Sequence, residues 1–379
     1  MNRDAVNIEE LRRRARRRLP RLLFDYIDGG AGDESGLKRN TASFAGYRLS
    51  PRYLLDIGAR TTATSLWERR FAAPFGIAPV GLAGLFYRDG ELLFAQAARD
   101  AGIPYVMSGA SIASIEEVTA IDSQSTWYQL YPARDRGLTL DIVRRAADAG
   151  VAVLVITVDL PVPAKRERDI RNGFDYDLRL SPSLALDALK HPRWTLDHLC
   201  RGGLPSFGTW ARYAGTGASA REVARFFLDQ GYPTLTWVDM EKLRRDWPGR
   251  LIIKGLLHAD DARMAAAIGA DGVIVSNHGG RQLACLPTAL EALPEIRAAV
   301  GDRMRVMVDG GIRCGSDVAI ALGLGADFVF IGRAALYGLA AAGYEGVLRS
   351  VAILKEELDL TMGQIGVTSV PGLRSALVS

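Results

Sequence analysis

The sequence predicts an α/β protein built as a closed (β/α)8 barrel, or TIM barrel, and three observations support this fold class. Eight short apolar runs recur along the chain without the polar alternation of half-buried strands. Segments with helical periodicity separate most of these runs. The 379 residues, 48% of them hydrophobic, suffice for one such barrel with insertions. A doubly wound open sheet is the alternative fold, but it would not need eight such units in a row.

The expected strands are, in chain order, residues 75–80, 103–108, 126–131, 151–159, 251–254, 273–276, 306–309 and 328–332. Helical segments are clearest at 91–101, 138–149, 259–268 and 316–324. Glycine and alanine directly follow each of these segments or close it, as is typical where a helix stops before the next strand. We therefore expect a single domain, residues 1–379, with its barrel at about 71–350.

Two regions fall outside the repeat. Residues 1–70 contain a basic amphipathic helix followed by a glycine-rich passage at 25–33. A long insertion of about residues 160–220 follows the fourth strand and has no clear period. Its leucine, aromatic and basic residues suit either a lid or a segment resting on a membrane surface. The N-terminal region and the insertion are therefore predicted as additions to the barrel.

The charge pattern argues against a nucleic-acid partner. Much of the net charge of +4 lies in the arginine-rich run 12–18, which no aromatic residue interrupts. The solvated face of an N-terminal helix explains this run better than nucleic-acid contact, while contact with anionic lipid stays open.

Composition also limits the compartment and the metal chemistry. Cys200, Cys285 and Cys314 are odd in number and lack CxxC spacing, so neither a disulfide framework, a thiolate zinc site nor any other metal site is expected. No signal peptide opens the chain, and no apolar run reaches the roughly 20 residues that span a bilayer. We expect a cytoplasmic protein that at most lies on the inner face of the cell membrane.

Polar groups gather where the expected strands end, which is where barrel enzymes place their active sites. Burying these groups unpaired would cost several kcal/mol, about 2–7 each, so packing alone does not explain them. The sixth strand leads into His278 and Arg281, a proton acceptor and a guanidinium that could hold a carboxylate. A solvated histidine in an ordinary turn is the alternative. The other polar groups at strand ends are Ser108, Gln129, Tyr131, Thr157, Asp159, Arg166, Lys254, Ser276 and Asp309.

The last two strand ends suggest a phosphate site. Gly310, Gly311 and Arg313 follow the seventh strand, and Gly332 and Arg333 follow the eighth. Loops at these two positions of such barrels often bind phosphoryl groups through glycine N–H groups. With Lys254 as a fixed cation nearby, this favours flavin mononucleotide (FMN). Neither a Gly-x-Gly-x-x-Gly fingerprint nor a P-loop is present.

The motifs resemble those of the FMN-dependent (S)-2-hydroxy acid dehydrogenase/oxidase family from about residue 20 to the C-terminus. The segments that carry the resemblance are 129–131, 157–159, 166–169, 276–283 and 309–311. Segments 191–194, 254–257 and 334–340 are most similar to the (S)-mandelate dehydrogenase branch. The resemblance implies oxidation of an (S)-2-hydroxy acid to the 2-oxo acid, with electrons passed to a quinone or oxygen. It also implies a homotetramer, and a membrane contact through the insertion.

The resemblance also assigns roles to the residues. His278 would be the catalytic base, oriented by Asp159, and Tyr131 would bind the substrate oxygen. Arg281 and Arg166, helped by Tyr26, would bind the carboxylate. The residues expected to hold FMN are Pro79, Val80, Gly81, Ser108, Gln129, Thr157, Lys254, Ser276, Asp309, Gly310, Gly311, Arg313, Gly332 and Arg333.

Departures from the family pattern point to the substrate. Ala110 replaces an aromatic residue of some relatives and should widen the pocket, and Leu82, Leu85 and Phe86 make it apolar. We therefore expect a bulky or aromatic substrate, with a small aliphatic 2-hydroxy acid as the alternative. Val80 replaces a threonine, which removes one hydroxyl contact to the flavin. Ala284 replaces an aspartate and Cys314 a basic residue. We expect neither of these two to abolish catalysis, although Cys314 should weaken phosphate binding.

Two other functions remain as alternatives from the sequence. An FMN barrel could instead isomerise a diphosphate, although the histidine–aspartate pair and Tyr131 make this less attractive. An inert barrel could use the arginine run and the insertion to dock on membrane or nucleic acid, since fold alone does not assign function.

Overall fold

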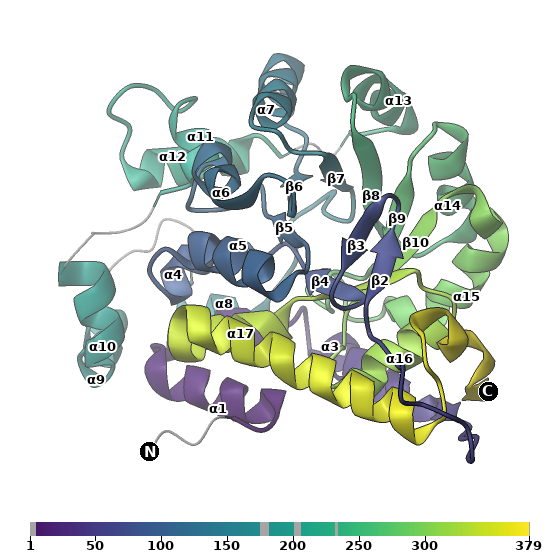
Figure 1. Ribbon diagram of the computed structural model, residues 1–379. Helices are drawn as coiled ribbons and strands as arrows, with labels where there is room; N and C mark the ends of the chain where they lie inside the picture. The colour runs from purple at the N-terminus through teal and green to yellow at the C-terminus, as the bar shows by residue number, and fades with distance from the viewer. Residues whose placement is uncertain (1–4, 175–181, 201–205, 232–233, 379) are drawn as a thin grey trace.

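The computed structural model describes residues 5–174, 182–200, 206–231 and 234–378, and these residues form a closed barrel of eight parallel strands (Figure 1). The strand order around the barrel is β10-β11-β4-β5-β6-β7-β8-β9. Each strand lies within or beside a run expected from the sequence, so the barrel is confirmed and the open sheet is not observed. The strands are β4 (Phe75–Ile77), β5 (Tyr105–Met107), β6 (Thr126–Leu130), β7 (Val153–Thr157), β8 (Arg250–Leu256), β9 (Gly272–Val275), β10 (Arg305–Asp309) and β11 (Phe328–Ile331).

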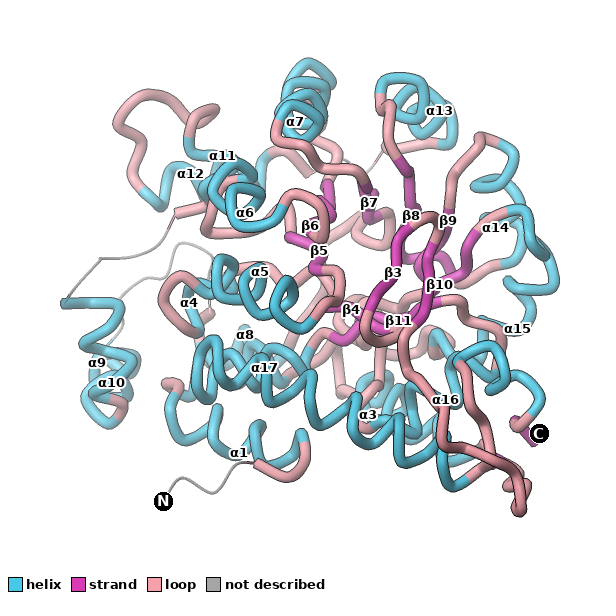
Figure 2. Tube along the Cα trace, viewed as in Figure 1, coloured by secondary structure: helices cyan, strands magenta, loops and turns pink. Residues whose placement is uncertain are grey.

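Helices surround the strands on the outside of the barrel (Figure 2). The four helices expected from the sequence correspond to α5, α7, α14 and α16. Local signals fix several starts: α6 and α15 each begin with a capping box, at Ser114 and Thr288. The outer helices are α4 (Ala83–Phe86), α5 (Gly90–Ala101), α6 (Ile115–Asp122), α7 (Arg136–Asp148), α13 (Trp237–Asp246), α14 (Ala259–Ala267), α15 (Ala289–Val300), α16 (Gly315–Gly323) and α17 (Arg333–Gln364), with the short η3 (Gly301–Arg303) and η4 (Val370–Ser375).

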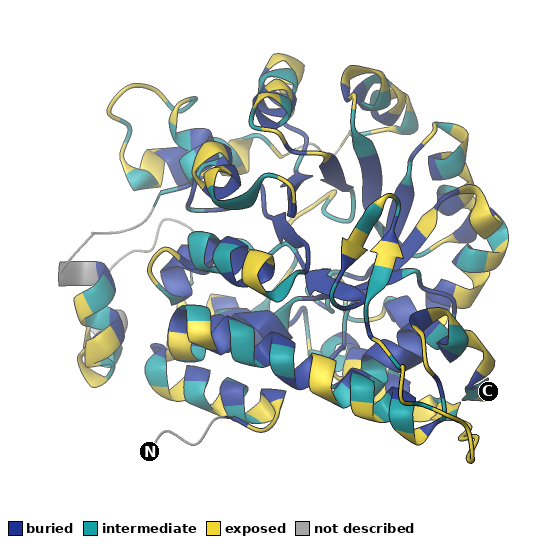
Figure 3. Cartoon of the chain, viewed as in Figure 1, coloured by how far each residue is buried: buried dark blue, intermediate teal, exposed yellow. Residues whose placement is uncertain are grey.

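Burial follows this layering (Figure 3). The strands are buried on both faces, and the helices bury only the side that faces them. At the N-terminal mouth of the barrel, a hairpin of β2 (Thr64–Leu66) and β3 (Arg69–Phe71) packs Leu66 and Phe71 into the barrel core. The ring of Phe71 meets Phe328 at the start of β11, with centroids 5.6 Å apart. This end of the barrel is therefore closed by apolar packing.

The N-terminal region adds helices that pack outside the ring of strands. It contains α1 (Ile8–Arg18), α2 (Arg21–Asp28), α3 (Ser35–Ala42), η1 (Ser43–Gly46) and β1 (Arg48–Leu49), which pairs with β12 (Leu377–Val378). Helix α1 packs against α17 through its buried Ile8, Leu11 and Ala15. The arginine run is not simply a solvated face, because Arg12 pairs with Asp28 and Arg18 with Asp197. Those acidic partners lie 16 and 179 residues away along the chain, so the sequence of the arginine run does not predict them.

The insertion is longer than expected. It contains α8 (Glu167–Asn172), α9 (Pro182–Lys190), α10 (Pro192–Thr195), η2 (Leu196–Cys200), α11 (Gly208–Ala211) and α12 (Ala220–Asp229). The sequence placed its end near residue 220, where a capping box at Ser219 starts a helix. That helix, α12, packs on α11, and the helix leading into β8 is α13. The side chain of Cys200 and residues 175–181, 201–205 and 232–233 lie outside what the structure describes. Within the described ranges, every helix is too short or too polar to cross a bilayer.

Candidate active site

A cavity of about 880 Å³ opens at the C-terminal ends of the barrel strands. It brings together residues at or just after the ends of all eight strands with residues of α2 and of the insertion. Sixteen of the twenty sequence-predicted site residues line it: Tyr26, Pro79, Val80, Gly81, Tyr131, Thr157, Arg166, Lys254, His278, Arg281, Asp309, Gly310, Gly311, Arg313, Gly332 and Arg333. The other four, Ser108, Gln129, Asp159 and Ser276, contact residues at or beside the cavity wall.

His278 and Asp159 form a hydrogen-bonded pair at the wall. The distance between His278 Nδ1 and Asp159 Oδ1 is 3.0 Å. Because a carboxylate accepts at Nδ1, the proton of a neutral imidazole lies there and Nε2 is left as the basic nitrogen. Gly255 gives Asp159 its room, since a Cβ on this residue would lie 2.6 Å from the Asp159 side chain and its φ is +107°. His278 itself has a φ of +58°, an uncommon conformation for a residue with a side chain and one that clusters at functional sites.

The surroundings keep the imidazole neutral and the carboxylate charged. Burial lowers the pKa of His278, and Lys254 and Arg166 lower it further, against the opposing effect of Asp159. Burial would raise the pKa of Asp159, but His278 and Lys254 outweigh it, so that pKa lies below its usual range. The pair is therefore a neutral base backed by an anion at neutral pH.

Three neighbouring strand ends, those of β8, β9 and β10, bring together Lys254, Ser276 and Asp309, and these three buried residues are called the ionic triangle. Lys254 Nζ lies 3.1 Å from Asp309 Oδ2 and donates to Ser276 Oγ at 3.0 Å. Ser276 Oγ donates to Asp309 Oδ1 at 2.5 Å and accepts the main-chain N–H of His278 at 3.0 Å. Burial would lower the Lys254 pKa, but Asp309 and Asp159 raise it. The cavity floor thus carries a fixed ammonium group.

The guanidinium-bearing residues Arg281 and Arg166 line the same cavity as His278 and Lys254. Arg281 Cζ lies 4.7 Å from the centroid of the Tyr26 ring, and Arg166 Nε donates to the main-chain oxygen of Arg281 at 3.2 Å. Arg281 Nη1 donates to the main-chain oxygens of Tyr26 and Gly29. The expected carboxylate-binding residues are therefore neighbours.

Arg313 and Arg333 stand at the expected phosphate end. Neither forms an ion pair with a carboxylate among the described residues. Burial, with Arg281 and Arg313 nearby, lowers the pKa of Arg333 to about 9. A cluster of partly buried cations without a carboxylate is stabilised by a bound anion, so the phosphate of FMN fits this end. Cys314 caps α16 and contacts Ser316, and it does not line the cavity.

The far side of the cavity fits the polar edge of a flavin. Ser108 Oγ and the N–H of Gly109 both bond Gln129 Oε1, each at 3.2 Å. Gln129 Nε2 and Thr157 Oγ1 are buried and have no hydrogen-bond partner among the described residues. Buried polar atoms without partners are rare, and a ring with carbonyl oxygens and nitrogens would satisfy both. The donor set and its buried orphan atoms therefore suit FMN.

Sequence reasoning missed the aromatic wall that the insertion contributes. Phe227 of α12 meets Tyr131 and Trp210 edge-on, with centroids 6.2 and 5.0 Å apart. Trp210 donates its indole N–H to Gly109 O at 2.7 Å. No periodic pattern marks these residues, and only their aromatic character in an irregular insertion could have suggested them.

The apolar side of the cavity differs slightly from expectation. Leu82 and Ala110 line it as expected. Leu85 and Phe86 do not, because α4 turns them into the core, where they are 1% and 0% exposed. Their contribution to the pocket is indirect, since the Phe86 ring stacks on Tyr26 with centroids 5.9 Å apart.

Comparison with known proteins identifies relatives along almost the whole chain. The family described as FMN-dependent dehydrogenase matches residues 15–379. L-lactate dehydrogenase of Caulobacter vibrioides (strain NA1000 / CB15N) is 41% identical over 370 residues, which are 98% of this chain and 96% of that protein. (S)-Mandelate dehydrogenase of Pseudomonas putida is 40% identical over 374 residues, 98% of this chain and 93% of that protein.

Solved structures agree with this result. The crystal structure of a monotopic membrane protein, (S)-mandelate dehydrogenase, matches with a TM-score of 0.95 and 38% identity, covering 99% of this chain and 100% of that one. A mandelate oxidase solved with benzoyl-formic acid matches with a TM-score of 0.83 and 38% identity, covering 99% of this chain and 98% of that one.

Proposed function

The chain belongs to the FMN-dependent dehydrogenase family, and we propose that it oxidises an (S)-2-hydroxy acid with a bulky or aromatic substituent, such as (S)-mandelate, to the 2-oxo acid. The observation that carries this proposal is the meeting of a His278–Asp159 pair, Arg281 and Lys254 in one cavity. Membership of a family of dehydrogenases favours this reaction over the diphosphate-isomerase and inert-barrel alternatives.

In this proposal Arg281 and Arg166 bind the substrate carboxylate, with the Tyr26 hydroxyl beside them. Two guanidinium groups suit a carboxylate because they can donate paired hydrogen bonds and fix its orientation. The carboxylate then holds the 2-carbon within reach of His278, and Tyr131 hydrogen-bonds the substrate's 2-oxygen. The ring of Phe227 supports Tyr131 from the insertion side.

His278 Nε2 accepts a proton as the 2-carbon is oxidised. Asp159 holds the ring through Nδ1 and stabilises the imidazolium that forms, as a carboxylate behind a catalytic histidine generally does. The two electrons and the second proton that the substrate loses would pass to FMN when it is bound. Lys254, fixed by Asp309 and Ser276, supplies positive charge where electron density would accumulate.

The residues that would hold FMN are those of the cavity floor and the phosphate end. Ser108, Gln129 and Thr157 would meet its polar edge, and Pro79, Val80 and Gly81 one face. Arg313 and Arg333, with the glycines 310, 311 and 332, would take the phosphate.

The experiment is anaerobic mixing of the purified holoprotein with (S)-mandelate, (R)-mandelate, L-lactate and longer 2-hydroxy acids. We expect (S)-mandelate to bleach the visible absorbance of the flavin. The matched variant His278→Ala should keep its flavin and lose reduction. If no 2-hydroxy acid reduces the flavin, the proposed reaction is wrong.

A small aliphatic substrate is the second candidate, because L-lactate dehydrogenases are among the relatives at 41% identity. Leu82 and Ala110 at the cavity wall favour the larger substrate. A ratio of kcat/KM for L-lactate over (S)-mandelate above one in the same panel would select the lactate alternative.

We further propose that the insertion rests on the inner face of the cell membrane and that a quinone takes the electrons, with oxygen as the alternative acceptor. On α9 and just after α10, Leu186, Leu189 and Leu196 are 63%, 75% and 54% exposed, and Lys190 lies beside them. Exposed leucines beside basic residues suit an interfacial helix. Co-sedimentation with anionic vesicles should fall in Leu189→Glu, and reoxidation rates with a quinone or with oxygen distinguish the acceptors.

For the assembly we propose a cytoplasmic homotetramer, on the basis of the resemblance to the family. Light scattering of the detergent-treated protein tests it, and a monomer mass would reject it.

A further inference from the structure

The main chain at the C-terminal end of α2 contacts two of the binding arginines. Arg281 Nη1 donates to the main-chain oxygens of Tyr26 at 2.6 Å and Gly29 at 3.0 Å. Arg333 donates to Ile27 O at 3.0 Å and to Gly29 O at 2.6 Å. These three oxygens, of Tyr26, Ile27 and Gly29, are called the α2 carbonyl end below. The oxygen of Gly29 bridges both guanidinium groups.

The position of these carbonyls explains why they attract cations. The last carbonyls of a helix lack intrahelical partners and carry partial negative charge. Residue 29 is a glycine for lack of space, because a Cβ there would lie 2.7 Å from Asp25 O, and any other residue would shift the main chain at this end of α2. The α2 carbonyl end therefore sets where both guanidinium groups point.

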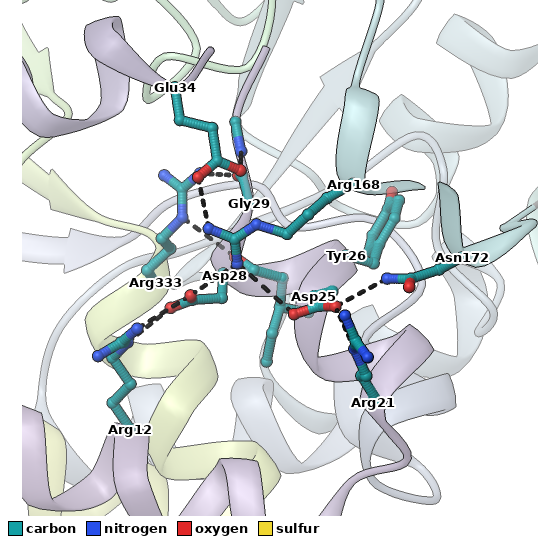
Figure 4. Close-up of polar contacts among 12 residues, drawn as sticks. Arg12, Arg21, Asp25, Tyr26, Asp28, Gly29, Glu34, Arg168, Asn172 and Arg333 are labelled. Carbon is teal, nitrogen blue, oxygen red and sulfur yellow. Dashed lines mark hydrogen bonds and ion pairs between the residues drawn. The ribbon is translucent and has the colours of Figure 1, made fainter. Parts of the chain in front are cut away.

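Arg168 holds this end from the other side (Figure 4). Its guanidinium lies 3.1 Å from Asp28 Oδ2 and 3.6 Å from Asp25 Oδ1, and it also pairs with Glu34. Glu34 in turn accepts the N–H of Gly30 at 3.2 Å. Arg168 thus ties together carboxylates on both sides of Gly29.

Asp28 extends the same network toward the rest of the fold. Its carboxylate accepts hydrogen bonds from Arg12 at 2.6 and 3.0 Å and from the Tyr337 hydroxyl at 2.8 Å. Burial alone would raise the pKa of Asp28, but Arg12, Tyr337 and Arg168 lower it, so it stays charged. The network joins α1, α2, α8 and α17, and α8 follows directly on Arg166.

We propose that Arg168 is a positioning residue that fixes the α2 carbonyl end and thereby orients Arg281 toward the substrate carboxylate and Arg333 toward the FMN phosphate. The two anions are taken from the proposed function, on which this inference rests. Arg168 touches neither anion, and it does not line the cavity. Its loss leaves three carboxylates, of Asp25, Asp28 and Glu34, with one fewer cation between them and loosens Gly29.

Arg171 provides a matched control, which distinguishes the proposed positioning role of Arg168 from that of an ion pair with a structural role alone. Arg171 lies on the same helix one turn away, is 72% exposed on its side chain and pairs only with Glu167 among the described residues. Surface pairs of this kind contribute about 0–1 kcal/mol. Arg171→Met therefore removes an arginine from α8 without touching the α2 carbonyl end.

The experiment compares Arg168→Met, Arg168→Lys and Arg171→Met with the unaltered chain. Two dissociation constants are measured without turnover: that of FMN, by fluorescence titration of flavin-stripped protein, and that of oxalate, by the change it causes in the flavin spectrum. Arg168→Met should raise both about tenfold, as for partners that orient a binding group indirectly. At saturating substrate, kcat should stay within about twofold because the base is untouched.

Arg168→Lys should bring both dissociation constants part of the way back to the values of the unaltered chain. Arg171→Met should change neither constant. Values for Arg168→Met equal to those for Arg171→Met would overturn the proposal. If Arg168→Met does not fold, Glu34→Gln carries the test, since it removes one carboxylate and keeps Arg168. Unchanged constants in that variant would overturn the proposal equally. Neither constant requires oxidation of a 2-hydroxy acid, so failure of the proposed reaction would be seen separately.

Discussion

Replacing Asp159 with asparagine removes the charge behind His278 while keeping a side chain of the same size. The amide oxygen can still accept the hydrogen bond from Nδ1 of His278, which lies 3.0 Å from Oδ1 of Asp159 in the unaltered chain. Gly255 leaves no room for a larger residue, so asparagine is the replacement that isolates the charge. Asp159 does not line the cavity, and we expect FMN to bind as before.

The expected effect follows from the charge that develops on the imidazole. Two unit charges about 4 Å apart interact by about 4 kcal/mol at an effective dielectric constant of about 20. Solvent screens the pair little, since the side chains of His278 and Asp159 are 20% and 10% exposed. Each 1.4 kcal/mol is about tenfold in rate, so a transition state carrying most of the charge loses about two to three orders of magnitude.

The assay is stopped-flow measurement of anaerobic flavin reduction at saturating substrate, with flavin content and substrate affinity measured in parallel. We expect the rate constant to fall at least about hundredfold in Asp159→Asn while flavin content stays constant. A decrease in the rate constant of less than tenfold would refute the assignment of His278 as a base that becomes charged. His278 and Asp159 are too close together and too well buried for the loss of the Asp159 charge to leave an imidazolium unaffected.

Three further predictions concern proton uptake, the ionic triangle and the pocket. Because the pKa of His278 is lowered below 6.5 and the neutral form is the base, kcat/KM should stay flat as pH falls to that value and decline only below it; a decline beginning above pH 7 would contradict this. Lys254→Met should lower the melting temperature, since an unpaired buried Asp309 costs about 3–5 kcal/mol, and adding Asp309→Asn should restore the melting temperature but not the rate of flavin reduction. Ala110→Trp should lower the ratio of kcat/KM for (S)-mandelate over L-lactate at least tenfold, and an unchanged ratio would show that the substituent lies elsewhere.

The sequence predicted the barrel and most of the site because both depend on local patterns. A buried parallel strand needs a continuous apolar run, and a polar residue that ends such a run must have a partner or a function. Lys254, two residues before the end of β8, and Asp309, the last residue of β10, are examples, and the structure places Lys254 Nζ 3.1 Å from Asp309 Oδ2. Their mutual ion pair was not foreseen, because strand order around the barrel decides which ends are neighbours.

The insertion resisted prediction for a different reason. Trp210 and Phe227 reach the cavity through short helices that pack on one another. No period relates such residues to the barrel, so their contribution depends on tertiary contacts alone. The end of the insertion was misplaced for the same reason, since the capping box at Ser219 starts α12 as clearly as Thr236 starts α13.

Hydrogen bonds to main-chain carbonyls are the least visible kind of contact in a sequence. Arg281 and Arg333 bond three carbonyls of α2, and a carbonyl is present at every residue, so no side chain records the choice. The sequence does show the groups around these carbonyls. Gly29 stands where a Cβ would lie 2.7 Å from Asp25 O, and carboxylates lie on both sides of it. Acidic residues flanking glycines at the end of a helix, with an arginine elsewhere to bind them, are therefore a signal for a carbonyl end that orients cations. The Arg168 variants test that signal directly, because they change the carboxylate network and leave every carbonyl in the chain.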